Sequence, residues 1–276
     1  MDPFKALVLG VVQGLTEFLP VSSTGHLRIV PAFVGWDDPG AAFSAIIQLG
    51  TTLAVLIYFR RDLSSIARGF LVGLRRPREA ARTSPEARMG WYLVLATVPI
   101  GLAGLAFTGQ IESGARSLPL IASTLIAFSV VMVAAERFRP ARERRTQEQV
   151  TLADAIAVGA AQALALVPGV SRSASTISAG LFMGLDRRAA ARFSFLLSTP
   201  AIVLAALFEL RGEAGHLTPG DALEYAVGIA AAFVTGYVAI AFLLRFLATN
   251  TLIPFVAYRV PVGAIVLILW ATEAIH

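Results

Sequence analysis

The sequence predicts an all-α integral membrane protein, with six transmembrane helices and two re-entrant helix–loop–helix hairpins arranged as inverted-topology repeats. Three observations predict this fold. The 276-residue chain is 56% hydrophobic and only 15% charged, against roughly 25% charged residues in soluble domains. It contains six apolar stretches long enough to cross a bilayer. It also contains two apolar regions that polar residues interrupt. We therefore expect a single membrane domain over residues 1–276.

Six segments satisfy the requirement for a bilayer-spanning helix, which needs about 20 mostly apolar residues. In chain order they are roughly 41–59, 89–107, 118–135, 193–210, 222–246 and 256–275. Aromatic side chains with a polar end gather at membrane interfaces, so Trp91, Tyr258 and Trp270 are expected to be interfacial anchors.

The two interrupted regions cover about 4–34 and 153–183, and their breaks read "PVSSTG" and "PGVSRSAST". Each half of these regions is too short to cross a bilayer. Irregular backbone at membrane depth is tolerated only where protein buries it or where it lines a wet cavity. Both regions are therefore predicted to be re-entrant hairpins.

Loop arginines predict the orientation. Eight arginines lie in 60–88 and five in 136–150, and arginine-rich loops stay in the cytoplasm. The arginine-poor loops at 108–117 and 211–221 then lie outside, as do both termini. The membrane composition argues against nucleic acid as the partner of this basic chain. The absence of cysteine excludes disulfides and Cys-ligated zinc.

The interrupted regions align with each other when the chain is shifted by 149 residues. "ALVLGVVQGLTEFLPVSS" (6–23) then lies over "AIAVGAAQALALVPGVSR" (155–172) with six identities. Three predicted spans separate the copies, so the copies must have opposite orientations. We expect inverted repeats over approximately 1–135 and 153–276, with the two polar breaks meeting near the midplane.

The copies differ where chemistry would need them to differ. The unlike pairs are Glu17 and Leu166, Ser23 and Arg172, and His26 and Ser175. An arginine at membrane depth is costly unless an anion or a carbonyl cage meets it, and its bidentate donors suit phosphate. His26 could act as nucleophile or acid–base group, while Glu17 could orient the imidazole or hold a divalent cation.

The hydroxyl-rich breaks predict a phosphate site, because backbone N–H groups at a helix start bind anions. Its candidate residues are Ser22, Thr24, Gly25, Ser171, Ser173 and Thr176. Structural alternatives remain open: such hydroxyls also satisfy free carbonyls in broken helices, and Arg172 could form a purely structural salt bridge with Glu17.

The segments "QGLTEFLPVSSTGH" (13–26) and "PGVSRSAST" (168–176) resemble the two motifs of the bacterial undecaprenyl-diphosphate phosphatase family, which is linked to bacitracin resistance. The resemblance also covers the chain length, the motif separation and the arginine-rich first loop. Carried over by position, it implies a catalytic set. This set is Glu17, Ser23, His26 and Arg172, with Gln13 at the variable Glu/Gln position of the first motif.

The resemblance implies a membrane hydrolase that converts undecaprenyl diphosphate to undecaprenyl phosphate, the lipid carrier of peptidoglycan synthesis. It implies dependence on Mg²⁺ or Ca²⁺, with Glu17 and Gln13 as metal ligands. The expected location is the bacterial cytoplasmic (inner) membrane, with the site open to the outer, periplasmic face. The nucleophile, either His26 or Ser23, stays open, as does a homodimer. A polyprenyl-phosphate transporter or flippase is the alternative function that inverted repeats favour.

Overall fold

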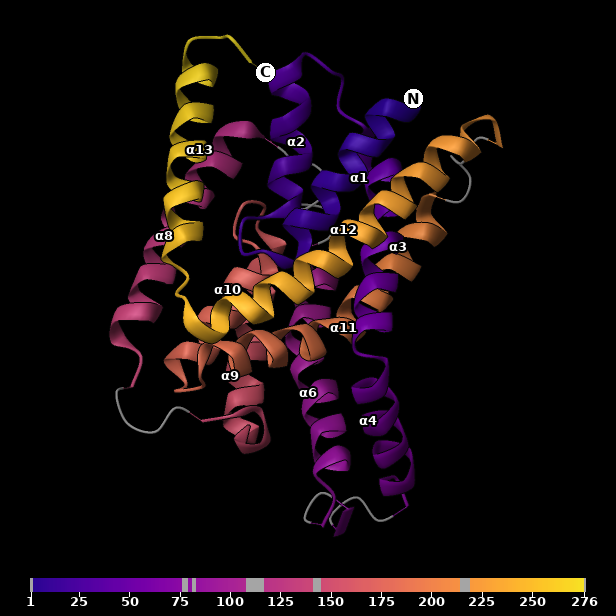
Figure 1. The fold of residues 1–276 in the computed structure, drawn as a ribbon, viewed down its shortest axis with the longest axis vertical. Helices are drawn as coiled ribbons and strands as arrows, with labels where there is room; N and C mark the ends of the chain where they lie inside the picture. The colour runs from indigo at the N-terminus through magenta and orange to yellow at the C-terminus, as the bar shows by residue number, and fades with distance from the viewer. Residues whose placement is uncertain are drawn as a thin grey trace.

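The computed structural model describes residues 2–75, 79–80, 83–107, 117–140, 145–213 and 219–275, which fold mainly into helices (Figure 1). In chain order the elements are α1 (Pro3–Phe18), α2 (Ser23–Val34), α3 (Gly40–Tyr58), α4 (Arg60–Gly73), α6 (Pro85–Ala106), α8 (Leu118–Phe138), η1 (Gln147–Gln149), α9 (Leu152–Gln162), η2 (Ala163–Leu166), α10 (Arg172–Phe182), α11 (Arg187–Glu213), η4 (Pro219–Asp221), α12 (Ala222–Thr249) and α13 (Ile253–Ala271).

Each of the six predicted spans overlaps one long helix. By length and composition α6, α8, α11, α12 and α13 could each cross a membrane alone. The first predicted span, α3, meets the same criterion only together with α4, and the two are bent by 75° at their junction. The protein is therefore an all-helical, multi-pass membrane protein with five or six candidate spans among the described residues.

Several residues used to predict the orientation lie outside the described residues. They are Arg76, Arg78 and Arg82 in the first arginine-rich loop, Arg142 and Arg144 in the second, and 108–116 and 214–218 in the predicted outer loops.

The two interrupted regions form short helices on either side of a break. α1 and α2 have 16 and 12 residues, and α9 and α10 have 11 each, all below the roughly 20 residues that a span needs. Local signals start them: Asp2 accepts a hydrogen bond from the Phe4 amide, and Thr151 with Asp154 forms a capping box on α9.

Small residues let α1 and α3 pack closely against α12. A Cβ added at Gly10 would lie 2.5 Å from the Gly228 carbonyl oxygen, and one added at Gly14 would lie 2.6 Å from that of Ala232. Membrane helices commonly approach each other through such small residues. The contact fixes the helix that carries the first candidate site residues.

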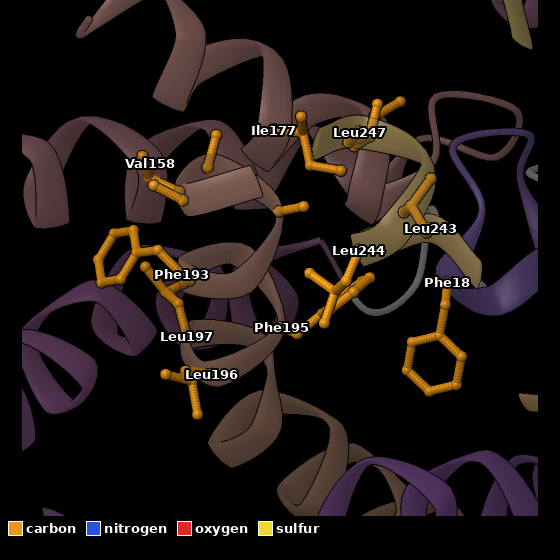
Figure 2. Packing of buried hydrophobic residues seen from close by; sticks show 14 of the residues in the cluster. Phe18, Val158, Ile177, Phe193, Phe195, Leu196, Leu197, Leu243, Leu244 and Leu247 are labelled. Atoms are coloured by element: carbon orange, nitrogen blue, oxygen red, sulfur yellow. The ribbon is translucent and has the colours of Figure 1, made fainter. Parts of the chain in front are cut away.

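The largest apolar cluster places the end of α1 against α11 (Figure 2). The rings of Phe18 and Phe195 meet edge to face with centroids 5.6 Å apart, and Leu243 and Leu244 of α12 belong to the same cluster. Because Phe18 directly follows Glu17, this packing also restrains the position of the Glu17 carboxylate.

The close approach of α1 and α12 leads to a stability prediction. We expect Gly14→Ala to lower the free energy of unfolding by about 1–3 kcal/mol, because the added methyl group overlaps backbone atoms of α12. The matched control is Gly101→Ala, where a Cβ meets nothing within 4 Å. Thermal unfolding in detergent measures both variants, and equal melting temperatures would contradict this account of the packing.

Candidate active site

Glu17 stands at the end of α1, directly before the first break. Leu19, the residue before Pro20, is extended with φ −70° and ψ 145°, because proline disfavours the helical conformation in its predecessor. The helix therefore ends at Phe18, and the chain turns so that α2 begins at Ser23. Glu17 and Ser23 are brought to opposite sides of one short turn.

Both breaks end in a serine with an unusual backbone conformation. Ser22 has φ 77° and Ser171, its partner in the 149-residue alignment, has φ 76°. Each caps the following helix, with its hydroxyl accepting from the amide of Gly25 at 3.4 Å or of Ala174 at 3.3 Å. A positive φ costs a non-glycine residue of order 1–3 kcal/mol, and such strain is often found at functional sites.

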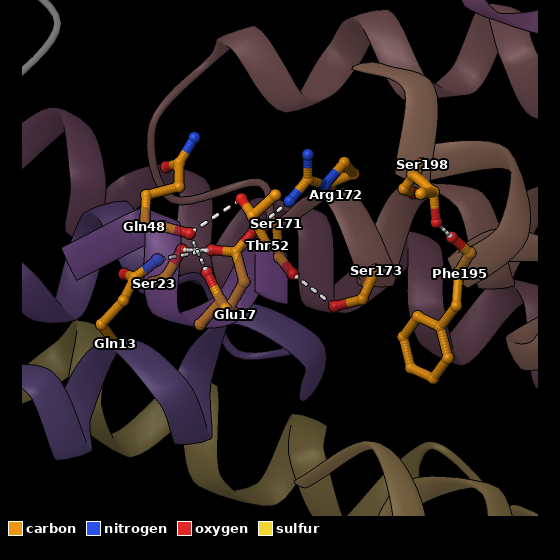
Figure 3. Close-up of polar contacts among 12 residues, drawn as sticks. Gln13, Glu17, Ser23, Gln48, Thr52, Ser171, Arg172, Ser173, Phe195 and Ser198 are labelled. Carbon is orange, nitrogen blue, oxygen red and sulfur yellow. Dashed lines mark hydrogen bonds and ion pairs between the residues drawn. The ribbon is translucent and has the colours of Figure 1, made fainter. Parts of the chain in front are cut away.

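The Glu17 carboxylate is the centre of the polar cluster (Figure 3). Its Oε2 accepts hydrogen bonds from the Ser23 hydroxyl at 2.6 Å and from the Gln13 amide at 3.2 Å. Its Oε1 forms an ion pair with Nη2 of Arg172. Glu17 is buried, so this carboxylate depends on these partners in place of water.

The ion pair joins the two breaks, because Arg172 is the first residue of α10 and lies 155 residues from Glu17. A second contact supports it: the Ser173 hydroxyl donates to the Leu19 carbonyl oxygen at 3.0 Å. In the described hydrogen bonds, the guanidinium of Arg172 donates through Nη2 alone. A guanidinium has five N–H donors, so others remain for an anionic ligand.

Arg259, on α13, is fully buried and contacts both breaks. Its Nη1 donates to the carbonyl oxygens of Pro20 and Val170, each at 3.2 Å, and its Nη2 donates to that of Gly169 at 2.8 Å. Its Nε contacts the Leu125 carbonyl oxygen and the Ser129 hydroxyl of α8, both at 3.3 Å. These acceptors are neutral, so a carbonyl cage satisfies the guanidinium.

Sequence reasoning missed Arg259, although a usable signal was present. The residue stands within the apolar segment "IPFVAYRVPVGAIVLILWA". The cost of an arginine at membrane depth, which drew attention to Arg172, applies equally here.

The described hydrogen bonds of the His26 ring go to residues other than Glu17, Ser23 and Arg172. Its Nδ1 contacts the Ser22 carbonyl oxygen at 2.7 Å, and its Nε2 contacts the Tyr258 hydroxyl at 2.8 Å. Tyr258, which the sequence predicts to be an interfacial anchor, is 46% exposed, and its hydroxyl contacts this buried histidine. The described contacts of His26 therefore connect it to the break and to α13.

Most of the candidate phosphate residues already form hydrogen bonds within the protein. Ser22 and Ser171 cap helices, and the Thr176 hydroxyl bonds to Ser194 and to the Arg172 carbonyl oxygen. Thr24 is exposed. Ser23 and Arg172 open α2 and α10 and contact the same carboxylate, so the N-termini of these helices converge, and their dipoles favour an anion between them.

Other residues complete the surroundings of the ion pair. Ser194 and Ser198 of α11 line a hollow of about 10 Å³ beside Glu17 and Arg172, which is room for about one water. Figure 3 also places Gln48 and Thr52 of α3 in this region. Sequence reasoning assigned none of these four residues to the site.

The donor set also fits a hard divalent cation. The Glu17 carboxylate, the Ser23 hydroxyl and the Gln13 amide lie together, and Mg²⁺ and Ca²⁺ take oxygen ligands. Among the described residues, no group of three His, Cys, Asp or Glu side chains could hold a metal. A cation here would therefore depend on water or on phosphate oxygens for its remaining ligands.

This chain matches known proteins over nearly its whole length. The family described as Bacitracin resistance protein BacA matches residues 6–265. The chain is 48% identical over 279 residues to an undecaprenyl-diphosphatase of Nocardioides sp., covering 100% of this chain and 99% of that protein. It is 49% identical over 272 residues to the undecaprenyl-diphosphatase of Myxococcus xanthus, covering 99% and 90%.

The carbonyl cage of Arg259 leads to a prediction about local stability. We expect Arg259→Met to increase hydrogen–deuterium exchange in peptides covering 19–22 and 167–171, because three carbonyls lose their donor while the side chain keeps a similar length. Arg245→Met, on the exposed side of α12, is the control. Unchanged protection of both breaks in folded Arg259→Met protein would show that the cage does not hold them.

Proposed function

The chain belongs to the bacitracin resistance protein family, and from this premise we propose that it hydrolyses undecaprenyl diphosphate to undecaprenyl phosphate and inorganic phosphate. This activity recycles the lipid carrier of peptidoglycan synthesis and thereby confers bacitracin resistance. The observation that carries the proposal is the cluster of Glu17, Ser23 and Arg172, which combines a hydroxyl, a carboxylate and a phosphate-binding cation within a membrane protein.

The substrate has two parts that need different surroundings. A polyprenyl tail stays in lipid, while a diphosphate needs concentrated positive charge. The helix starts at Ser23 and Arg172 supply aligned backbone dipoles, and the guanidinium of Arg172 supplies bidentate donors for the terminal phosphate. On binding, Arg172 exchanges the Glu17 carboxylate for phosphate oxygens.

Ser23 is the better-supported nucleophile. Its hydroxyl donates to Glu17 at 2.6 Å, so a base lies in position to take its proton. Attack of Ser23 Oγ on the terminal phosphorus breaks the bond to the bridging oxygen, and undecaprenyl phosphate leaves. Water then cleaves the phosphoserine, releasing inorganic phosphate and restoring the hydroxyl.

His26 has a supporting role in this scheme. A phosphohistidine pathway needs a free ring nitrogen facing the phosphorus, and both ring nitrogens of His26 already have partners. The contact from Nδ1 to the Ser22 carbonyl oxygen acts on the residue before the nucleophile. We infer that His26 holds the break in the conformation that directs Ser23 toward Glu17.

A divalent cation, Mg²⁺ or Ca²⁺, is part of the proposal, and Glu17 and Gln13 are its protein ligands. Bound there, it would neutralise charge on the diphosphate. The chain's own contribution is the buried carboxylate, which Gln13 orients through its amide.

The proposed placement in the bacterial inner membrane has α1–α2 and α9–α10 as re-entrant hairpins of two inverted repeats. The shared conformation of Ser22 and Ser171 supports the repeat. Both chain ends lie at one end of the molecule, and the C-terminal end of α4 and the N-terminal end of α6 lie at the other (Figure 1). With the arginine-rich loops in the cytoplasm, the termini and the opening of the site face the periplasm.

The function test uses Ser23→Ala and Arg172→Lys, purified in detergent and assayed for phosphate release from undecaprenyl diphosphate. We expect near-complete loss for Ser23→Ala. Arg172→Lys should lose about a hundredfold, because the lost fork of donors contributes on the order of 3 kcal/mol to the transition state. Exposed Arg188→Lys is the matched control.

Each alternative gives a different result in this assay. Substantial activity in Ser23→Ala would make His26 the nucleophile, and full activity in Arg172→Lys would remove Arg172 from the site. Absence of phosphate release by the wild type would reject the hydrolase. Release in detergent, where no second compartment exists, excludes a protein that only transports the lipid.

The topology prediction uses the absence of native cysteine. We expect Val72→Cys, on the exposed side of α4, to react with an impermeant maleimide only from the cytoplasmic side. Ala274→Cys, near the other end of the molecule, should react only from the outside. Labelling of intact spheroplasts and inverted vesicles makes the comparison, and the reverse pattern would overturn the proposed orientation.

A further inference from the structure

Tyr258 is the described hydrogen-bond partner of Nε2 of His26. The two rings are stacked, with centroids 5.6 Å apart and planes 15° from parallel, and the hydroxyl lies 2.8 Å from Nε2. His26 is 4% exposed while Tyr258 is 46% exposed. The tyrosine ring therefore lies against a buried imidazole, and it restrains both the plane of the His26 ring and the Nε2 atom.

The hydrogen bond on the other side of the imidazole identifies the tautomer that is present. The Ser22 carbonyl oxygen, 2.7 Å from Nδ1, can only accept. Nδ1 must therefore carry a hydrogen, and in the neutral ring Nε2 is then an acceptor. The Tyr258 hydroxyl can donate to that acceptor, so both contacts favour the same tautomer.

This tautomer matters for the break before the nucleophile. Ser22 has the strained φ of 77°, and its carbonyl oxygen also accepts from the His26 backbone amide at 3.1 Å. The opposite tautomer would place a ring lone pair against that oxygen. Loss of the Nδ1–H donor would then release Ser22, and with it the direction of the Ser23 hydroxyl toward Glu17.

We propose that Tyr258 is a positioning residue of the phosphatase reaction: its hydroxyl holds His26 in the Nδ1–H tautomer, which secures Ser22 and so orients Ser23. This role rests on the proposed function, because it assigns Ser23 to the chemistry. It gives α13 two adjacent contacts with the breaks. Arg259 donates hydrogen bonds to carbonyl oxygens of both breaks, and Tyr258 orients His26, which restrains Ser22.

The first test separates the hydroxyl of Tyr258 from its ring. Tyr258→Phe keeps the stacking and removes the donor, while Tyr258→Leu removes both. We expect both variants to lose kcat by about tenfold or more, the usual range when a group that orients an active residue is removed. KM should change less than twofold, because Arg172 still binds the phosphate. Tyr237→Phe, at a comparably exposed tyrosine of α12, is the control.

The second test reports on the imidazole directly. In ¹⁵N NMR of protein labelled at histidine, the wild-type His26 should show protonated Nδ1 and unprotonated Nε2, and Tyr258→Phe should show a mixture of tautomers. His26→Gln identifies the resonances. A wild-type His26 with protonated Nε2 overturns the proposal even if no Tyr258 variant folds.

The two tests together distinguish the possible failures. Wild-type kcat in Tyr258→Phe with impaired Tyr258→Leu would mean that the ring only packs, which rejects the positioning role. If the wild-type protein releases no phosphate while the tautomer is as expected, the proposed function fails and the His26–Tyr258 contact stands. Unchanged ¹⁵N shifts in Tyr258→Phe would reject the hydroxyl as the determinant of the tautomer.

Discussion

The buried guanidinium of Arg259 and the interrupted helices stabilise each other. Helices that stop at membrane depth leave carbonyl groups without hydrogen-bond donors, and each such group is costly in an apolar medium. A buried arginine has the opposite need, for acceptors on all its N–H groups. Carbonyls of Pro20, Gly169 and Val170 meet both needs at one point. The breaks are thereby held close enough for Arg172 to reach Glu17.

The same contacts help to keep Ser22 and Ser171 in their strained backbone conformation. Ser22 and Ser171 would relax if their breaks were free, because a positive φ is unfavourable for serine. Packing by α13 from one side and the contact between Ser173 and Leu19 from the other leave little room to do so. The start of each following helix is thus directed into the shared polar region.

Much of the fold could be predicted, because the apolar content of each segment and the position of its polar residues determine its local structure. The apolar runs identified the helices that became α6, α8, α11, α12 and α13, and the polar breaks located the interruptions. Aligning Ser22 with Ser171 identified residues that prove to have the same backbone conformation. The bend between α3 and α4 was missed, because no proline or glycine marks it.

The site was only partly predictable, because its contacts join distant parts of the chain. Motif positions identified Glu17, Ser23 and Arg172, and the possible pairing of Glu17 with Arg172 could be considered from charge alone. The side chains that act on the breaks from α13 lie more than 230 positions beyond the first break. No local pattern connects Tyr258 with His26 or Arg259 with Pro20.

The ion pair between Arg172 and Glu17 has a consequence for selectivity among anions. In the proposed phosphate site, the Arg172 guanidinium is already paired with Glu17 before any ligand arrives, so a ligand must displace a close and buried carboxylate. Chloride brings a single charge and no set of oxygens to match the guanidinium. A terminal phosphate brings more charge and three acceptor oxygens. We therefore expect small anions such as chloride to compete poorly with Glu17 for Arg172, and phosphate esters and anhydrides to compete well.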